Sequence, residues 1–208
     1  MDEAQFSNFN HSYCSLHFCF YSDKSFNLFE IANTAENIFS YLVLNYSFSN
    51  KLNNYPYRFI VYESSYNATL QENQTIIFST SSCDVVVSVV YGMVSDIFGQ
   101  AEKLYPWLYY GFCEYLVSHF CSDKRSYYLG ILNSNSNLIP LEQLFYISPS
   151  TLEKSKLDIY YANTSSFVSY LIDKYSSYRF SVFLESLLKS GDVKNASILA
   201  FGKDITQP

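Results

Sequence analysis

Basic side chains are scarce in this chain of 208 residues, which has 13 Lys and Arg, 19 Asp and Glu, and a net charge of −6. Only Lys124 and Arg125 are adjacent to each other. Proteins that bind nucleic acid neutralise its phosphates with clustered Lys and Arg. We therefore expect no direct nucleic-acid partner.

The chain also lacks a long uncharged apolar segment. The two longest candidates, 85–95 and 104–113, fall short of the ~18 residues that a membrane helix needs, and the second contains Pro106. The acidic start, Met1-Asp2-Glu3, does not have the positive flank of a secretory signal. These absences predict a soluble protein without a membrane span.

Cysteine occurs five times, an odd number without the spacing of a disulfide framework. This pattern favours reduced thiols and a cytoplasmic location. Six Asn-x-Ser/Thr sequences, which are acceptor sites for N-glycosylation in secreted proteins, argue against a cytoplasmic location. A chain rich in Asn and Ser, however, contains several of them by chance. They begin at Asn10, Asn45, Asn67, Asn73, Asn163 and Asn195.

Glycine is rare as well, with six residues and neither a glycine-rich phosphate loop nor a Gly-x-Ser-x-Gly sequence. We expect no cofactor.

The chain is rich in aromatic residues, with 21 Tyr and 18 Phe beside a single Trp. Biased composition explains this surplus, and so does a binding surface, because Tyr is enriched at protein interfaces. The sequence leaves both interpretations open.

Hydrophobic periodicity predicts an α+β fold, with a small N-terminal mixed sheet and a helix followed by a mainly helical half. Leu16, Phe18 and Phe20 alternate with other residues as in a half-buried strand over 15–21. The Val-rich run 84–98 fits either a strand or a buried helix. The remaining predicted strands are 57–62 and 75–78, and the predicted helices are 26–48, 104–120, 160–175, 180–188 and 195–201. The predicted domain organisation is a flexible leader over 1–14, one domain over 15–202 and a tail over 203–208.

Four motifs follow one another in the second half of the chain. They are Tyr105-Pro-Trp-Leu-Tyr-Tyr-Gly-Phe-Cys-Glu-Tyr115, Ile139-Pro-Leu-Glu-Gln-Leu144, the segment from Tyr161 to Tyr175, and Ala200-Phe-Gly202. In this order they resemble Pro-x-Trp-Leu-x-Glu-Gly-x-Ala-Glu-Tyr, Ile-Pro-Leu-x-x-Leu, Tyr-Ala-x-Ser-x-Ser-Phe-Val-x-Tyr-Leu and Ala-x-Gly of the gluzincin-like (peptidase MA-like) zinc metallopeptidases. The resemblance spans about 15–202 and implies the fold of that family.

The family's zinc site is missing from this sequence. Its members hold zinc with the two His of a His-Glu-x-x-His helix and with a Glu of the following helix, and the first Glu takes a proton from the zinc-bound water. The corresponding window, 84–98, contains neither His nor Glu, and the third-ligand position is Tyr110. The resemblance therefore implies an inactive pseudo-peptidase without catalytic residues or metal.

The remains of the substrate cleft are predicted to be lined by Tyr91, Trp107, Tyr110 and Glu114. Aromatic residues at helical spacing are equally typical of core packing. The predicted function is a protein-interaction or scaffold module with an unidentified protein partner.

Two other functions remain open. His11, Cys14, His17 and Cys19 are all possible zinc ligands, and they suggest a metal-dependent hydrolase with a site of its own. The other alternative is a structural subunit of a large assembly.

Overall fold

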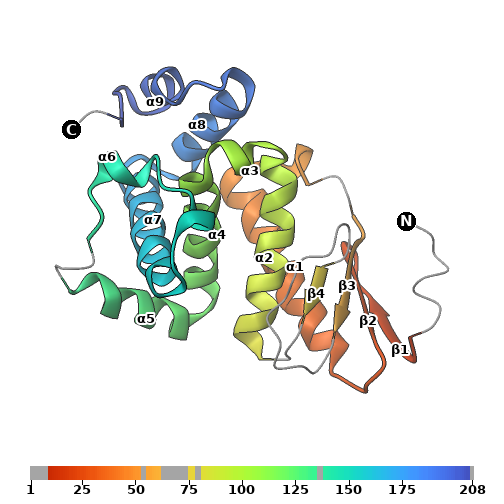
Figure 1. Cartoon of the computed structure of the whole chain (residues 1–208). Coiled ribbons are helices and arrows are strands. Elements are labelled where there is room, and N and C mark those ends of the chain that lie inside the picture. Colours follow the sequence, from red (N-terminus) through yellow and green to blue (C-terminus); the bar gives the residue numbers. More distant parts are fainter. Residues whose placement is uncertain (1–8, 53–54, 62–74, 78–80, 135–137, 207–208) are drawn as a thin grey trace.

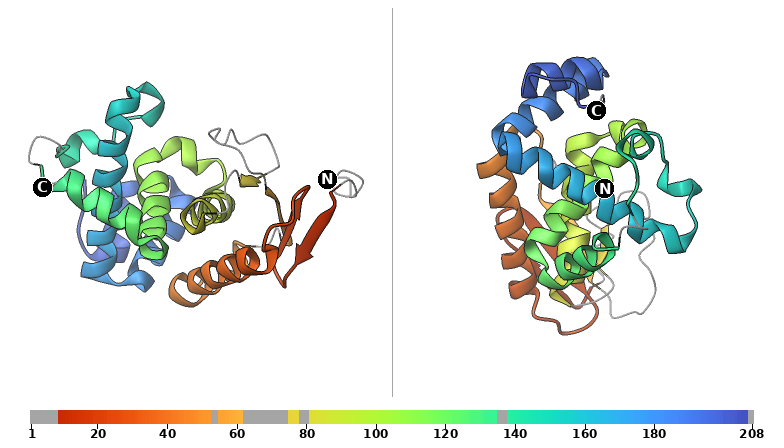
Figure 2. Two further views of the ribbon diagram at one scale, coloured as in Figure 1. Left: turned by 90° about the horizontal axis from the view of Figure 1, so that it is seen from below. Right: turned by 90° about the vertical axis from the view of Figure 1, so that its left-hand side faces the viewer.

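The computed structural model describes all residues except 1–8, 53–54, 62–74, 78–80, 135–137 and 207–208. Figure 1 shows the strands at one end of the molecule and the helices α4 to α9 at the other, with α1 and α2 between them. The left view of Figure 2 shows the same separation from below. The predicted α+β fold, with an N-terminal sheet followed by a mainly helical half, is confirmed.

The sheet has four strands in the order β1-β2-β3-β4. β1 is antiparallel to β2, whereas β2 with β3 and β3 with β4 are parallel, so the sheet is mixed as predicted. A parallel pair needs a crossover, and α1 supplies it between β2 and β3. The elements are β1 (His11–Cys14), β2 (Phe18–Ser22), α1 (Leu28–Tyr46), β3 (Tyr57–Val61) and β4 (Thr75–Ile77).

The first strand corrects the predicted leader, because its range of 1–14 includes β1. Most of β1 is exposed, so its residues carry no hydrophobic pattern from which a strand can be predicted. The prediction for β2 is also wrong in one detail. Leu16 lies before the strand and is 79% exposed, whereas Phe18, Cys19 and Phe20 are all buried.

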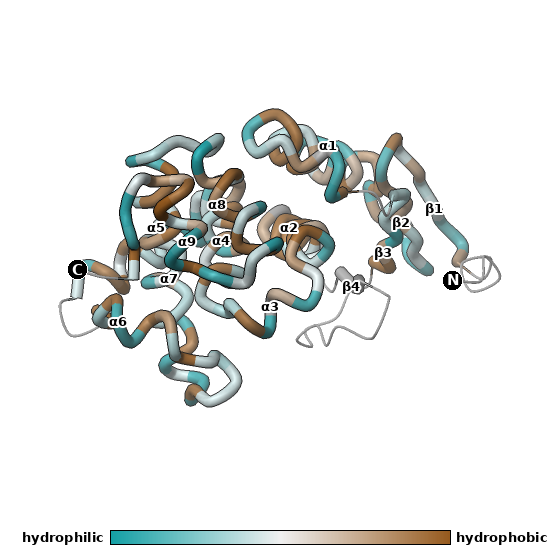
Figure 3. Tube along the Cα trace, turned by 90° about the horizontal axis from the view of Figure 1, so that it is seen from above, coloured by the Kyte–Doolittle hydropathy of each residue, from teal (hydrophilic) through white to brown (hydrophobic). Residues whose placement is uncertain are grey.

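Helix α2 (Ser82–Phe98) resolves the ambiguity of the Val-rich run. It begins with an N-cap, in which the Ser81 hydroxyl accepts a hydrogen bond from the N–H of Asp84. α2 packs against α1, α4 and β4, and Figure 3 shows hydrophobic residues along it where it lies between α1 and α4. Val89 and Val90 are fully buried. This burial outweighs the modest helix propensity of Val.

The C-terminal half contains the predicted helices. They are α4 (Pro106–Phe120), α7 (Lys154–Tyr175), α8 (Ser177–Ser190) and α9 (Val193–Phe201). Pro106 occupies the first turn of α4, and Gly191 and Gly202 end α8 and α9 in the left-handed conformation. The sequence did not predict α5 (Ser122–Leu132), which buries only Tyr128 and so has no apolar stripe. The shorter helices are α3 (Ala101–Leu104), α6 (Leu141–Leu144), η2 (Phe48–Asn50) and η4 (Pro149–Thr151).

Two disulfides correct the expectation of reduced thiols. Cys14 pairs with Cys19 across the β1–β2 hairpin, and Cys83 at the start of α2 pairs with Cys121 after α4. Both pairs bring together residues that the sequence pattern does not link. Cys113 is a buried free thiol.

The predicted tail over 203–208 is packed in part, since Ile205 is buried and its N–H donates to the Ser197 hydroxyl in α9. Among the described residues, no helix combines the length and apolar character that crossing a membrane requires.

Candidate functional site

A buried carboxylate marks the centre of the candidate site. Glu114 on α4 is 4% exposed. One of its oxygens accepts a hydrogen bond of 2.5 Å from the Tyr91 hydroxyl on α2, and the other accepts one of 2.7 Å from the Tyr128 hydroxyl on α5. Hydrogen bonds to a charged group are stronger than those between neutral groups. Glu114 therefore connects three helices.

Two further tyrosines complete this group. The ring of Tyr110 on α4 lies 6.3 Å from that of Tyr91 and 5.4 Å from that of Tyr161 on α7, measured between centroids. We refer to Tyr91, Tyr110, Glu114, Tyr128 and Tyr161 as the Tyr–Glu cluster. It draws residues from α2, α4, α5 and α7, and Glu114 supplies its only carboxylate.

Close packing of α4 on α7 holds the cluster together. At Gly111, a Cβ atom would lie 2.7 Å from the backbone oxygen of Thr164 and 2.9 Å from a methyl carbon of Val168. Side chains larger than hydrogen do not fit at such distances. Gly111 therefore allows Tyr110 to lie next to Tyr161.

The environment of the cluster favours the protonated form of three of its phenols, those of Tyr91, Tyr128 and Tyr161. Burial, and then the negative charge of Glu114, raises the pKa of both Tyr91 and Tyr128 well above the ordinary value of 10.0. Burial also raises the pKa of Tyr161 to about 12, with further contributions from Tyr110 and Glu114. The phenols of Tyr91 and Tyr128 donate hydrogen bonds, and the two oxygens of Glu114 accept them. The arrangement is that of a satisfied buried polar network.

The structure brings together three of the four predicted cleft residues. Tyr91, Tyr110 and Glu114 lie in the cluster. Trp107 does not, because its 1% exposed ring packs against Phe145 at 4.7 Å and Phe167 at 5.7 Å between centroids. Trp107 belongs to the packing of α4 on the later helices.

Sequence reasoning missed Tyr128 and Tyr161 as members of the cluster. Tyr161 opens one of the quoted motifs, so a signal was present, but the motif indicates helix packing and says nothing of Glu114. Tyr128 lies in the unpredicted helix α5, and only the fold brings its hydroxyl to Glu114.

The alternative metal cluster does not form. Cys14 and Cys19 are joined in a disulfide, and the Nδ1 atom of His17 lies 2.7 Å from a carboxylate oxygen of Glu36. The His17 ring also stacks on Phe39 at 3.8 Å between centroids. Across the described part of the chain, no group of three or more His, Cys, Asp or Glu is arranged to hold a metal ion.

Comparisons with known proteins leave the family open. No protein-family model matches this chain, and no curated protein or solved structure does.

Proposed function

We propose that this chain is a catalytically inactive relative of the gluzincin-like zinc metallopeptidases and serves as a protein-interaction module. The observation that carries the proposal is the pairing of Tyr91 on α2 with Tyr110 on α4 beside the buried Glu114. In an active relative, neighbouring positions on two such helices would carry the zinc ligands.

The spacing on α2 supports this assignment. Two residues four apart on a helix lie on one face, as the two His of His-Glu-x-x-His must. Val87 stands four residues before Tyr91 and packs against the core. Val87, Tyr91 and Tyr110 would therefore occupy the three ligand positions, and none of them is a good zinc ligand at neutral pH.

The hydrogen bonds of the cluster argue against an exposed catalytic carboxylate. Both oxygens of Glu114 accept hydrogen bonds from phenols, and the side chain is buried. A general base must reach the proton that it removes. The cluster instead stabilises the fold where metal would otherwise join the two helices.

For binding, Tyr91 and Tyr110 are the candidate contact residues, because both are partly exposed. Tyr side chains supply large contact areas at interfaces. Trp107 is too deeply buried to touch a partner and is removed from the predicted contact set.

Affinity purification from source cells, with wild-type protein and two variants, tests the proposal. Tyr110→Arg places a charge in the cleft, whereas Tyr178→Arg places the same charge on α8, where Tyr178 is 67% exposed. We expect one stoichiometric partner with wild type and with Tyr178→Arg, and its loss with Tyr110→Arg. Circular dichroism checks that both variants fold, and Tyr110→Ser repeats the test with a smaller change.

A partner that is retained by all variants, or no partner at all, contradicts the role of the cleft. Stoichiometric zinc together with chelator-sensitive hydrolysis of a peptide library contradicts the inactive assignment.

A further inference from the structure

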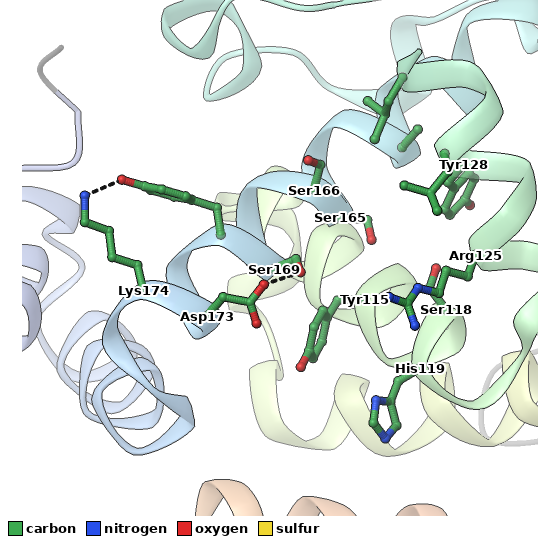
Figure 4. Close-up of a pocket in the computed structure, with 14 residues that line it drawn as sticks. Tyr115, Ser118, His119, Arg125, Tyr128, Ser165, Ser166, Ser169, Asp173 and Lys174 are labelled. Carbon is green, nitrogen blue, oxygen red and sulfur yellow. Dashed lines mark hydrogen bonds between the residues drawn. The ribbon is translucent and has the colours of Figure 1, made fainter.

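A second region of the molecule, which adjoins the Tyr–Glu cluster at Tyr128, has the form of a binding site. A groove of about 890 Å³ runs between α4, α5 and α7. Figure 4 shows its polar side chains: Ser165, Ser166 and Ser169 lie along α7, and Tyr115 lies between Asp173 and Arg125. Its volume lies in the range of small-molecule sites. The ring of Tyr128 lines the groove, while its hydroxyl binds Glu114.

Unused hydrogen-bonding groups meet at one end of this groove. Ser118, His119 and Arg125 all line it. The Ser118 hydroxyl oxygen is buried and has no hydrogen-bond partner. Within the described chain, no hydrogen bond or ion pair engages the Arg125 guanidinium, which has five N–H donors. The side chains of His119 and Arg125 are exposed, so these two groups are the ones a ligand in the groove can reach.

His119 lies close enough to Arg125 for the positive charges of the two groups to repel each other. Burial, and then the positive charge of Arg125, lowers the pKa of His119 below its ordinary value of 6.5. The ring of Tyr41 on α1 stacks on the His119 ring, with 4.5 Å between the two centroids, and adds no charged group there. An anion between His119 and Arg125 would remove the repulsion between these two groups.

The remaining charged groups of the groove already have partners. Asp173, the one carboxylate among the described residues that line the groove, accepts a hydrogen bond from Ser169 at 3.2 Å. Lys174 donates to the Tyr170 hydroxyl at 2.6 Å. In Figure 4, Asp173 lies on the opposite side of Tyr115 from Arg125. Among the described lining residues, Arg125 is therefore the charged side chain that no hydrogen bond or ion pair engages.

We propose that this groove binds a small phosphate-bearing molecule, with its phosphate held by Arg125 and His119. The planar fork of Arg matches two phosphate oxygens, and a ring N–H of His119 supplies a donor for another. The proposal does not depend on the peptidase-like assignment, because none of these residues belongs to the Tyr–Glu cluster.

Titration of ¹⁵N-histidine-labelled protein with inorganic phosphate, followed by NMR at constant pH and ionic strength, tests the site. We expect a saturable shift of the His119 ring signals and a raised His119 pKa at phosphate up to about 20 mM, the range of a weak single-group ligand. Arg125→Gln should weaken binding at least about tenfold, because it removes a charged hydrogen-bonding fork. Lys189→Gln, which removes the same charge from an exposed position on α8, should leave binding unchanged.

The proposal is overturned if phosphate causes no saturable shift, if Arg125→Gln binds as wild type does, or if both variants lose the same affinity. Acetate that binds as tightly as phosphate would also overturn it. Glycerol phosphate should bind, and vesicles that contain phosphatidic acid should not. The reverse result would assign the phosphate to a lipid surface and refute a free small molecule.

Discussion

At the scale of single residues, the main polar group of the Tyr–Glu cluster is the buried carboxylate of Glu114. A buried carboxylate is costly unless hydrogen bonds compensate for the lost water. Tyr91 and Tyr128 supply those bonds from two other helices. The side chain therefore links helices, in a region where the gluzincin-like assignment would place metal ligands in an active relative.

Two adjacent tyrosines allow this idea to be tested. Tyr128 donates to the buried Glu114, and Tyr127, which is 49% exposed, donates to Asp158 over the same 2.7 Å. Tyr128→Phe should lower the free energy of unfolding by about 1.5–3 kcal/mol. Tyr127→Phe should change it by less than about 0.5 kcal/mol. Urea unfolding measures both, and equal effects would show that burial of the bond does not matter.

The hydrogen-bonded contact of Glu36 with His17 predicts a pH dependence. Burial alone would raise the pKa of Glu36, but hydrogen bonds from the His17 ring, the Ser15 hydroxyl and the His17 N–H outweigh it and hold the pKa below 4.5. A lowered folded-state pKa contributes stability above the unfolded value, and this stability is lost as pH falls through the folded-state value.

Glu36→Gln should therefore reduce stability at neutral pH and flatten its fall below about pH 4.5. Unfolding curves between pH 3 and 7 measure the effect. Glu185→Gln, at an exposed position on α8, controls for the change in net charge. A steep acid loss that persists unchanged in Glu36→Gln would exclude this pair as its source.

At the scale of elements, the contact of α4 with α7 positions both the Tyr–Glu cluster and the proposed phosphate groove. Residues from both helices contribute to each. At Gly111 the two helices approach closely, and the backbone of α7 leaves no room for a side chain. This glycine therefore permits the observed separation of the two helices.

Gly111→Ala tests that constraint, with Gly130→Ala as its matched control. The Ala methyl at 111 would overlap Thr164, so α4 and α7 must move apart, at a cost of about 1–3 kcal/mol. At Gly130 in α5 nothing lies within 4 Å of the new methyl, and the better helix propensity of Ala should stabilise the protein by about 0.5–1 kcal/mol. Thermal unfolding distinguishes the two results, and a neutral Gly111→Ala would refute the constraint.

At the scale of the whole molecule, the two disulfides close chain loops of different length. Cys83–Cys121 closes a separation of 38 residues and ties α2 to α4, whereas Cys14–Cys19 closes a separation of 5 within one hairpin. Longer closed loops restrict the unfolded chain more strongly. The first disulfide should therefore stabilise the fold more than the second.

Replacing Cys83 and Cys121 with Ser should lower the free energy of unfolding by about 3–4 kcal/mol, and replacing Cys14 and Cys19 by about 2 kcal/mol. Unfolding without reductant followed by thiol titration should reveal one reactive thiol, that of Cys113. Five reactive thiols would show that neither disulfide forms.

Much of the fold was predictable from the sequence alone. Local periodicity predicted α1, α4, α7 and α8, because the residues of an apolar stripe on a helix recur three and four positions apart. The absence of His and Glu from 84–98 is likewise a property of the sequence, and it led to the prediction of an inactive site before any contact was known.

Other features were decided only by tertiary structure. The Val-rich run became the helix α2 because partners surround it, and β1 and α5 formed without a hydrophobic pattern of their own. The Tyr–Glu cluster and both disulfides join residues whose proximity no local spacing encodes. The sequence by itself determined which chemical groups the centre of this protein lacks, and the packing of distant helices decided which groups meet there, because hydrogen bonding and burial depend on neighbours in space.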